Sequence, residues 1–497
     1  AEAAARQRAE ADAEAQRRAQ ADADARRKAQ AEAEERRKEE ERRRVASSET
    51  PERNTPRNPP DTVARPLGKV SKLRVKLGSL PNESQSGWLG VTVETLERPL
   101  AAALGLRDAE AVLITATAPG GPGAQAGLRL GDIVVALNER PVADTREFTQ
   151  RLASMVPGSE AALEIWRAGD SSADFVRTVR NLATDGNTGA MHRMGRLYAG
   201  GLGVPRDEAQ AAGWYRKGAD AGDAASEGAL AVALLEGRGV AVDKQEGVRL
   251  LRSASAQGNP EAMGLLGRML VEGRNVDKDA AEGSRLLTAA SEADYSPAMV
   301  DLGRLLISGT SGVPTDPAKS AYWFRKAADM GNANGMAGLG SLYQQGKGVP
   351  ADLAQAVMWY KRGADRGSAV AMSDLGLLYV QGKGVERNEA AAVALFRKAA
   401  GLGNSIAMNN LAWMLQLGRG VDRKNPVEAA ELMMRSLERG NEFSQKQMTQ
   451  KSNTWSKEFR QALQAKLRDA GLYKGPLDGE FRDTTIAAIN AQFNRLR

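Results

Sequence analysis

Residues 331–367 read GNANGMAGLGSLYQQGKGVPADLAQAVMWYKRGADRG, and this segment is one copy of a block that recurs along the chain. Seven blocks follow one another between 186 and 440, at spacings of 36 or 37 residues. They start at Gly186, Gly222, Gly258, Asp294, Gly331, Gly367 and Gly403. A fixed period of this length is typical of stacked helical repeats, which usually serve as recognition surfaces.

Each block carries the signals of two capped helices. A side chain that can cap a helix N-terminus opens the first helix, a glycine ends it, and a second cap opens the next helix. The first caps are Asn187, Asp223, Asn259, Asn332, Ser368 and Asn404, and in the fourth block the cap moves to Ser296. The closing glycines are Gly201, Gly237, Gly273, Gly309, Gly346, Gly382 and Gly418. The second caps are Asp207, Asp243, Asp279, Asp316, Asp352, Asn388 and Asn425.

The first helix of each block holds a small residue at its centre, for example Gly195, Gly303 or Gly340. Glycine there costs roughly 1 kcal/mol relative to alanine, so we expect a neighbouring helix to approach closely. The blocks resemble Sel-one-like repeats, which are related to tetratricopeptide repeats. The resemblance implies a right-handed α-solenoid over 186–440 that acts as a scaffold and binds other proteins on its concave face. Aromatic pairs such as Trp359 and Tyr360 are expected in its core.

The segment before the repeats changes character twice. Residues 1–44 hold 15 alanines, 13 basic and 12 acidic residues, with carboxylates four residues before bases, which predicts a solvated single α-helix. Residues 45–86 are proline-rich and basic and are expected to form a disordered linker. The most basic run in this linker, Lys69–Lys76, could contact an anionic surface, but a solvated edge strand is favoured.

Helical periodicity is lost over residues 87–182. Short β-rich runs occur at 88–95, 111–117, 133–137, 162–166 and 175–179, and helices are expected at 98–104 and 145–154. The segments GWLGVTVE and APGGPGAQAGLRLGDIVVALNERPV resemble PDZ domains of the bacterial HtrA type.

The PDZ-like segment also predicts a peptide-binding site. Successive amides of the Trp88-Leu89-Gly90-Val91 loop can face a peptide's C-terminal carboxylate, and an extended peptide would pair with the strand through Val91 and Val93. The resemblance implies that Phe148 and Leu152 line the first side-chain pocket, although ordinary core packing explains these two residues equally well. The seven candidate residues are Trp88, Leu89, Gly90, Val91, Val93, Phe148 and Leu152.

After Gly440 the period stops, and residues 441–497 are read as a connecting helix and a small helical domain. The segment FRQALQAKLRDAGLYKGPLDGEFRDTTIAAINAQFN is similar to the small peptidoglycan-binding domain of cell-wall proteins. Arg482 and Asn494 stand where that family usually has glycine and glutamine. The alternative is a helical unit that closes the end of the solenoid.

Composition excludes several kinds of chemistry. The chain has 497 residues, no cysteine and one histidine, so disulfides, zinc–cysteine sites and multi-histidine metal sites are ruled out. We expect His192 on the surface, and no cofactor or metal. The net charge of +7 comes from interspersed bases and acids, which gives little support to nucleic-acid binding. No stretch is apolar enough to span a membrane.

The sequence thus predicts a multidomain, mainly α protein: a long charged helix, a small α+β PDZ-like domain, an α-solenoid of seven helix pairs and a small three-helix C-terminal domain. The preferred function is a non-catalytic scaffold of the bacterial periplasm or cell envelope that binds protein C-termini, other proteins and peptidoglycan. The alternative is the regulatory portion of a larger protease whose catalytic domain precedes Ala1. A free-standing lytic enzyme is disfavoured, because no carboxylate pair stands out.

Overall fold

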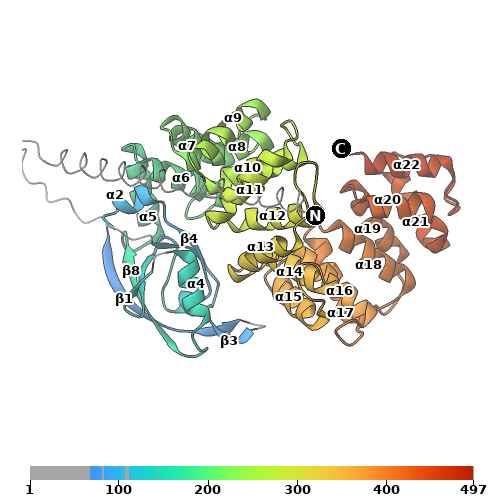
Figure 1. Ribbon diagram of the computed structural model, residues 1–497, viewed down its shortest axis with the longest axis horizontal. Helices are drawn as coiled ribbons and strands as arrows, with labels where there is room; N and C mark the ends of the chain where they lie inside the picture. The colour runs from blue at the N-terminus through green and yellow to red at the C-terminus, as the bar shows by residue number, and fades with distance from the viewer. Residues whose placement is uncertain (1–67, 81–82, 107–110, 143, 496–497) are drawn as a thin grey trace, which may run out of the picture. The chain divides into compact units, whose positions relative to one another are not determined.

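The computed structural model describes residues 68–80, 83–106, 111–142 and 144–495 (Figure 1). They belong to one compact unit, Pro66–Arg497. The predicted helix over 1–44 and the proline-rich part of the predicted linker lie outside the described residues.

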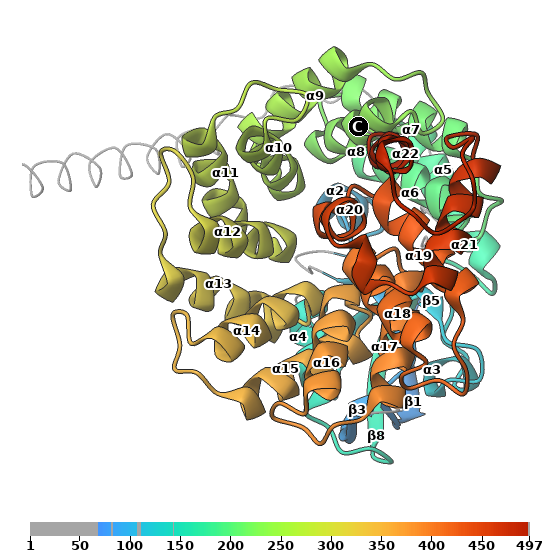
Figure 2. The ribbon, with the colours of Figure 1, turned by 90° about the vertical axis from the view of Figure 1, so that its right-hand side faces the viewer.

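The seven predicted helix pairs are present, and each of their helices has 13 residues. The first helices of the pairs are α6 (Thr188–Gly200), α8 (Ala224–Glu236), α10 (Pro260–Glu272), α12 (Ser296–Ser308), α14 (Ala333–Gln345), α16 (Ala369–Gln381) and α18 (Ser405–Leu417). The second helices are α7 (Glu208–Asp220), α9 (Lys244–Ala256), α11 (Ala280–Glu292), α13 (Pro317–Asp329), α15 (Leu353–Asp365), α17 (Glu389–Gly401) and α19 (Pro426–Glu438). The pairs follow an arc, with α10 and α12 on its inner side and α9, α11 and α15 on its outer side (Figure 2).

The predicted caps are confirmed with one exception. Each of the seven second caps accepts a hydrogen bond from an amide of its helix, as Asp207 does from Gln210. The prediction of Ser296 as a cap was wrong: Ser296 is the first residue of α12, and Tyr295 is the N-cap without a capping hydrogen bond. Pro297 is the second residue of α12 and so lies in the first turn, where proline is tolerated because its missing amide hydrogen has no partner in the helix.

In four of the seven blocks the small central residue of the first helix lies against an aromatic ring of the second helix, which confirms the predicted close approach. A Cβ atom at Gly195 would lie 2.2 Å from the Tyr215 ring, and one at Gly376 would lie 2.6 Å from the Phe396 ring. The rings of Phe324 and Tyr360 contact the corresponding glycines of the fourth and fifth blocks. The two helices of a pair therefore come closer together than an alanine would allow, and the buried ring offsets the low helix propensity of glycine.

A six-stranded sheet precedes the solenoid. Its strands are β1 (Lys69–Lys76), β4 (Val91–Thr95), β5 (Val112–Thr117), β6 (Ile133–Leu137), β7 (Arg140–Pro141) and β8 (Glu160–Arg167). The order is β1-β8-β6-β5-β4, with β7 paired to β6, and β2 (Gly78–Leu80) and β3 (Glu83–Trp88) form a separate hairpin. Three short helices complete this domain: α2 (Arg98–Ala103), α3 (Pro122–Gln125) and α4 (Thr145–Ala153).

The predicted disordered linker over 45–86 was too long. Strand β1 pairs with β8 along its whole length, from Lys69 opposite Arg167 to Lys76 opposite Glu160. It lies at one end of the sheet, so the edge-strand interpretation of this basic run is confirmed. Val75 is buried in the core of the domain while the lysines stay exposed, which is the alternation of a strand with one face in water. Residues 69–76 therefore belong to the folded domain and not to a linker.

The predicted β-run at 175–179 is instead part of helix α5 (Ser172–Thr184). Ser171 and Asp174 form a capping box, and Phe175, Val176 and Val179 recur at helical spacing on the buried face. Helix α5 packs along α6, as the second helix of each block packs along the first helix of the next. It therefore closes the N-terminal end of the solenoid.

Three helices follow the last repeat: α20 (Glu442–Gln450), α21 (Lys457–Asp469) and α22 (Asp483–Phe493), with a short 3-10 turn, η1 (Ser452–Thr454), between the first two. Asn441 caps α20, as asparagine caps the first helices of the repeats. Trp455, Phe459 and Leu463 belong to the same hydrophobic core as Leu411 and Met433 of the last repeat. The C-terminal helices thus cover the apolar face that the last repeat would otherwise expose.

Candidate functional site

Strand β4 forms one edge of the sheet, and among the described strands only β5 pairs with it. Its other side therefore offers unpaired backbone amides and carbonyls, as edge strands do. Helix α4 lies nearby, because the hydroxyls of Thr95 on β4 and Thr145 on α4 are 3.4 Å apart. An extended peptide could extend the sheet here by strand addition.

The loop before β4 is fixed by hydrogen bonds that its carbonyl groups accept. The Leu89 carbonyl accepts a hydrogen bond from the Gly123 amide at 2.8 Å, and the Gly90 carbonyl accepts one from Ala118 at 2.7 Å. Within the described residues, the amides of Leu89 and Gly90 donate no hydrogen bond to the protein. Gly90 has a φ of +70°, a conformation that favours glycine. Two adjacent unused amides in a left-handed turn are suited to an anion such as a carboxylate.

The structure brings five of the seven predicted residues into one apolar cluster. Leu89, Phe148 and Leu152 are buried in it, and Val91 and Val93 pack against it half-buried. Phe148 is 1% exposed and Leu152 6%, so both contribute to the domain core in this structure.

The remaining two predicted residues lie at the loop. Trp88 is half-buried, and a Cβ atom at Gly90 would be 3.3 Å from its ring. We call β4, the loop 88–90 and α4 the edge site. The binding role of all seven residues remains a prediction.

Sequence reasoning missed a cluster of charges that joins the edge site to the first repeat. Arg193 on α6 is 1% exposed. Its Nη1 lies 2.5 Å from Glu94 Oε2, and its Nε lies 3.0 Å from Glu97 Oε2. Arg196 Nη2 contacts Glu94 Oε1 at 2.8 Å, and His192 Nδ1 lies 3.1 Å from Glu97 Oε1. The expectation of a surface histidine was wrong, because His192 is buried between the two domains, with 8% of the residue exposed.

The charges of this cluster act on Glu97 most strongly. Burial raises the pKa of Glu97, but Arg193 and His192 more than offset this effect and bring the pKa down to about 2. The one available sequence signal was Arg193 itself: the corresponding residue of the next two blocks is Ala229 or Leu265. Its partners come from a different domain, about a hundred residues earlier, so no local pattern connects them.

Three adjoining cavities run over the first helices of the first four repeats; together we call them the repeat groove. The first, about 210 Å³, is lined by His192 and Arg196 on α6 and reaches Glu261 on α10. The second, about 250 Å³, shares Glu261 with the first and extends to Asp301 on α12. The third, about 490 Å³, shares Arg268 and Asp301 with the second. The groove is therefore continuous from α6 to α12.

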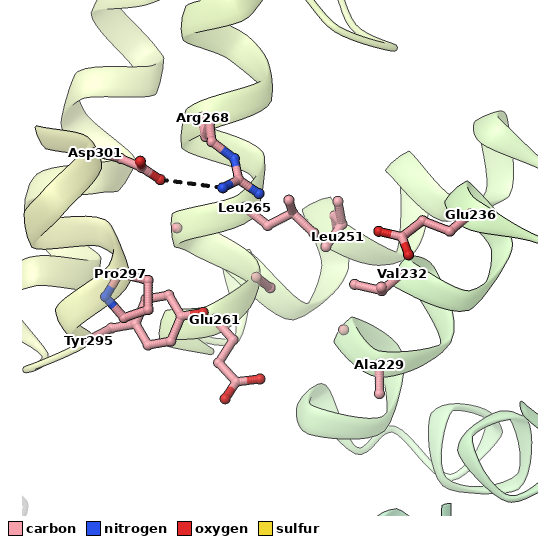
Figure 3. A pocket seen from close by; sticks show the side chains of 13 residues that line it. Ala229, Val232, Glu236, Leu251, Glu261, Leu265, Arg268, Tyr295, Pro297 and Asp301 are labelled. Carbon is pink, nitrogen blue, oxygen red and sulfur yellow. Dashed lines mark ion pairs between the residues drawn. The ribbon is translucent and has the colours of Figure 1, made fainter. Parts of the chain in front are cut away.

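The walls of the repeat groove are charged. Figure 3 shows Arg268 facing Asp301 from the neighbouring helix, and the Arg268 Nη1 and Asp301 Oδ2 atoms are 3.7 Å apart. Burial raises the pKa of the Asp301 carboxyl. Glu261 lines two of the cavities, and within the described residues its carboxylate has neither an ion pair nor a side-chain hydrogen bond.

Within the described ranges, no helix is long and apolar enough to cross a bilayer. The described residues also contain no group of three or more histidine, aspartate or glutamate side chains that could hold a metal ion.

The fold defines a helical-repeat protein with an attached small α+β domain. The PDZ domain model matches residues 87–174, and the Sel1 repeat model matches seven consecutive segments spanning 188–441, which is more than half of the chain. The chain belongs to the Sel1 repeat family.

Curated relatives match over a small part of the chain. A protein of Rhizobium meliloti named a probable periplasmic serine endoprotease DegP-like is 42% identical over 85 residues, which is 17% of each chain. Its counterpart from Brucella suis is 34% identical over 93 residues, 19% of this chain and 17% of the relative. The chain thus spans about a sixth of the length of these relatives.

Solved structures with related folds include a protective antigen of uropathogenic Escherichia coli with an SLR fold. It is 31% identical, with a TM-score of 0.41, over 60% of this chain and 64% of the antigen. A Sel1 repeat protein from Oxalobacter formigenes is 27% identical, with a TM-score of 0.41, over 56% of this chain and 80% of its own.

Proposed function

We propose that this chain is a non-catalytic scaffold of the bacterial cell envelope that captures protein C-termini at the edge site and holds partner proteins on its repeats. The observation that carries the proposal is the free edge of β4 beside a loop whose Leu89 and Gly90 amides are unused. Both matched families, the PDZ domain and the Sel1 repeat, are interaction modules. The envelope location is supported by the periplasmic name of the DegP-like relatives that share the PDZ region.

The protease alternative receives less support. The matches to DegP-like proteins cover only the PDZ region, which recognises peptides, and extend over 17% of the relative's length. They therefore favour a shared recognition module over a shared catalytic function.

A free peptide carboxylate should be required for binding at the edge site. We would measure binding of the full chain to synthetic hexapeptides with random sequences and a free C-terminus, and to the same mixture ending in an amide. We expect the amide to reduce affinity roughly tenfold or more, because it removes a charge-assisted pair of hydrogen bonds. Equal binding of the two mixtures would contradict the proposal.

A matched pair of variants locates the site. Gly90→Val should abolish carboxylate-dependent binding, because valine cannot adopt the left-handed turn without moving both amides. Gly158→Val serves as the control: Gly158 also has a positive φ, of +86°, and lies in a turn before β8 with open space around its Cβ position. We expect it to cost similar stability and to leave binding unchanged.

The C-terminal helices are proposed to contact peptidoglycan in addition to closing the solenoid. Gln464, fully buried, holds the loop between α21 and α22 by accepting from the Gly479 amide at 2.8 Å and donating to the Glu480 carbonyl at 3.0 Å. This ordered loop supports a surface that is fixed enough to bind a polymer. Sedimentation of the chain with purified sacculi is the expected result, and a chain that stays in the supernatant would rule out the cell-wall contact.

A further inference from the structure

Strand β4 and helix α4 of the edge site each contact the solenoid at one end. At the C-terminal end of β4, Glu94 contacts Arg193 and Arg196 of the first repeat. At the N-terminal end of α4, Arg146 Nη1 lies 3.1 Å from Asp294 Oδ2, in the turn before α12. Since Thr95 and Thr145 are neighbours, these contacts lie at the same end of the edge site.

The direction of a bound peptide follows from the position of the loop. A peptide carboxylate at the Leu89 and Gly90 amides would lie at the N-terminal end of β4. An antiparallel peptide then extends along β4 toward Thr95, and its upstream residues leave at the end that contacts α6. The upstream part of the partner's chain is thus directed at the first repeat.

The repeat groove begins at this point. Arg196 binds Glu94 of β4 with one side of its guanidinium and lines the first cavity of the groove, together with His192. At the other contact, Asp294 precedes Tyr295, which lines the second cavity. The residues that join the two domains are therefore the rim of the groove.

The charges of the groove suggest what enters it. Arg196, Arg238 and Arg268 already face carboxylates, namely Glu94, Glu236 and Asp301. Glu261 lies where two of the cavities meet, is exposed, and has no cationic partner among the described residues. An unpaired carboxylate in a groove with balanced charges favours a cation on the ligand.

We propose that the edge site and the repeat groove form one continuous binding surface for a single polypeptide. The C-terminus of the partner lies at β4, its upstream segment crosses α6, α8 and α10 in an extended form, and a lysine or arginine of that segment pairs with Glu261. This inference rests on the proposed function of the edge site, and it adds the chemistry of the upstream residues to that function.

A lysine scan along an extended peptide tests the proposal on the full chain. A single hexapeptide that binds the chain through its free C-terminus is lengthened at its N-terminus by about twelve glycine and serine residues, which span roughly 40 Å when extended. One lysine is then moved through the extension. We expect affinity to increase roughly threefold to fivefold when the lysine occupies one narrow window, relative to the neutral extension and to a glutamate at the same place.

Variants then assign the effect to Glu261. Glu261→Gln should remove the lysine effect and leave hexapeptide affinity unchanged, and Glu261→Lys should shift the preference to glutamate in the same window. Glu386→Gln is the matched control, because Glu386 is exposed in a loop outside the groove and has no ion pair within the described residues. We expect this control to change neither the affinity for the hexapeptide nor the affinity for the lysine-containing extension.

The outcomes separate the two proposals. If the unmodified chain does not bind the hexapeptide, both the proposed edge site and the continuous surface are wrong. Hexapeptide binding without a lysine window, or with a window that survives Glu261→Gln, overturns the continuous surface alone.

Discussion

Replacing Arg193 with methionine is expected to destabilise the junction between the PDZ domain and the first repeat by about 3–5 kcal/mol. Arg193 is 1% exposed, and Glu94 and Glu97 lie on either side of it. Removing the guanidinium leaves two largely buried carboxylates, with 23% of the Glu94 side chain and 13% of the Glu97 side chain exposed, without their main partner. The cost is therefore mostly that of uncompensated buried charge. Hydrogen exchange of the β4 and α6 amides would measure it locally.

Two further substitutions distinguish the effect of uncompensated buried charge from the loss of an ion pair alone. Arg249→Met is the matched control: Arg249 Nε lies 2.7 Å from Glu246 Oε2 on the surface of α9, and we expect no measurable change. Adding Glu94→Gln and Glu97→Gln to Arg193→Met should restore part of the lost stability, because the stranded charges are removed. If the two arginine variants behave alike, the cluster does not hold the junction.

Acid should weaken the same junction through Glu97. Its pKa of about 2 in the folded chain is below the value of about 4.3 in an unfolded chain. The folded state therefore binds this proton less readily, and the stabilisation is present above pH 4.3 and lost as the pH falls toward 2. This loss should be absent in Arg193→Met, which lacks the main group that depresses the pKa. Exchange rates of the α6 amides between pH 5 and pH 2.5 would show the difference.

The parts of the fold that depend on local signals could be predicted from the sequence. Thirteen of the repeat caps lie within three residues of the amides they bind, so Asn187 and Asp207 could be recognised by their neighbours alone. The sequence predicts an edge strand at β1 but does not show that it belongs to the folded domain, because its partner β8 lies about ninety residues later.

Pairings between distant residues could not be predicted. The β-prone residues Phe175, Val176 and Val179 suggested a strand, but the capping box at Ser171 and burial against the first repeat produced a helix. His192 was expected on the surface of α6, and only the folded chain brings Glu97 to it and both Glu94 and Glu97 to Arg193. For the edge site, the sequence predicted the loop and the strand, and it did not reveal that the C-terminal end of the strand contacts the first repeat.

Gly348→Ala is expected to destabilise the solenoid by about 2–5 kcal/mol, although the change adds one methyl group. Gly348 lies in the loop between α14 and α15 with a φ of +69°, where an alanine costs about 1–2 kcal/mol. Its Cβ atom would lie 2.0 Å from the carbonyl oxygen of Pro317, at the start of α13 in the preceding repeat. This neighbour is backbone, so one repeat would have to move relative to the next, and overpacking of this kind adds about 1–3 kcal/mol.

The same loop glycine contacts the preceding repeat closely in three further blocks. In the third block Asn275, with a φ of +62°, holds this position, and in the fourth a Cβ atom at Gly312 would lie 3.8 Å from Ala281. Gly239 lies against Glu208, Gly384 against Leu353 and Gly420 against Glu389, in each case at the first turn of the previous second helix. In the first repeat, Gly203 lies against Leu130 and Val176, so the PDZ domain and α5 take the place of a preceding repeat. These glycines therefore set the spacing between repeats, and Gly348→Ala should weaken the contact between its own repeat and the preceding one.

Gly367→Ala distinguishes coupling from backbone strain. Gly367 has a φ of +87° and no atom within 4 Å of its Cβ position, so we expect only the conformational cost of about 1–2 kcal/mol. Because stacked repeats are stabilised by their neighbours, a weakened contact at Gly348 should also split urea unfolding, followed by tryptophan fluorescence, into two transitions. Equal effects of the two substitutions, each with a single transition, would mean that the loop glycines serve the turn alone.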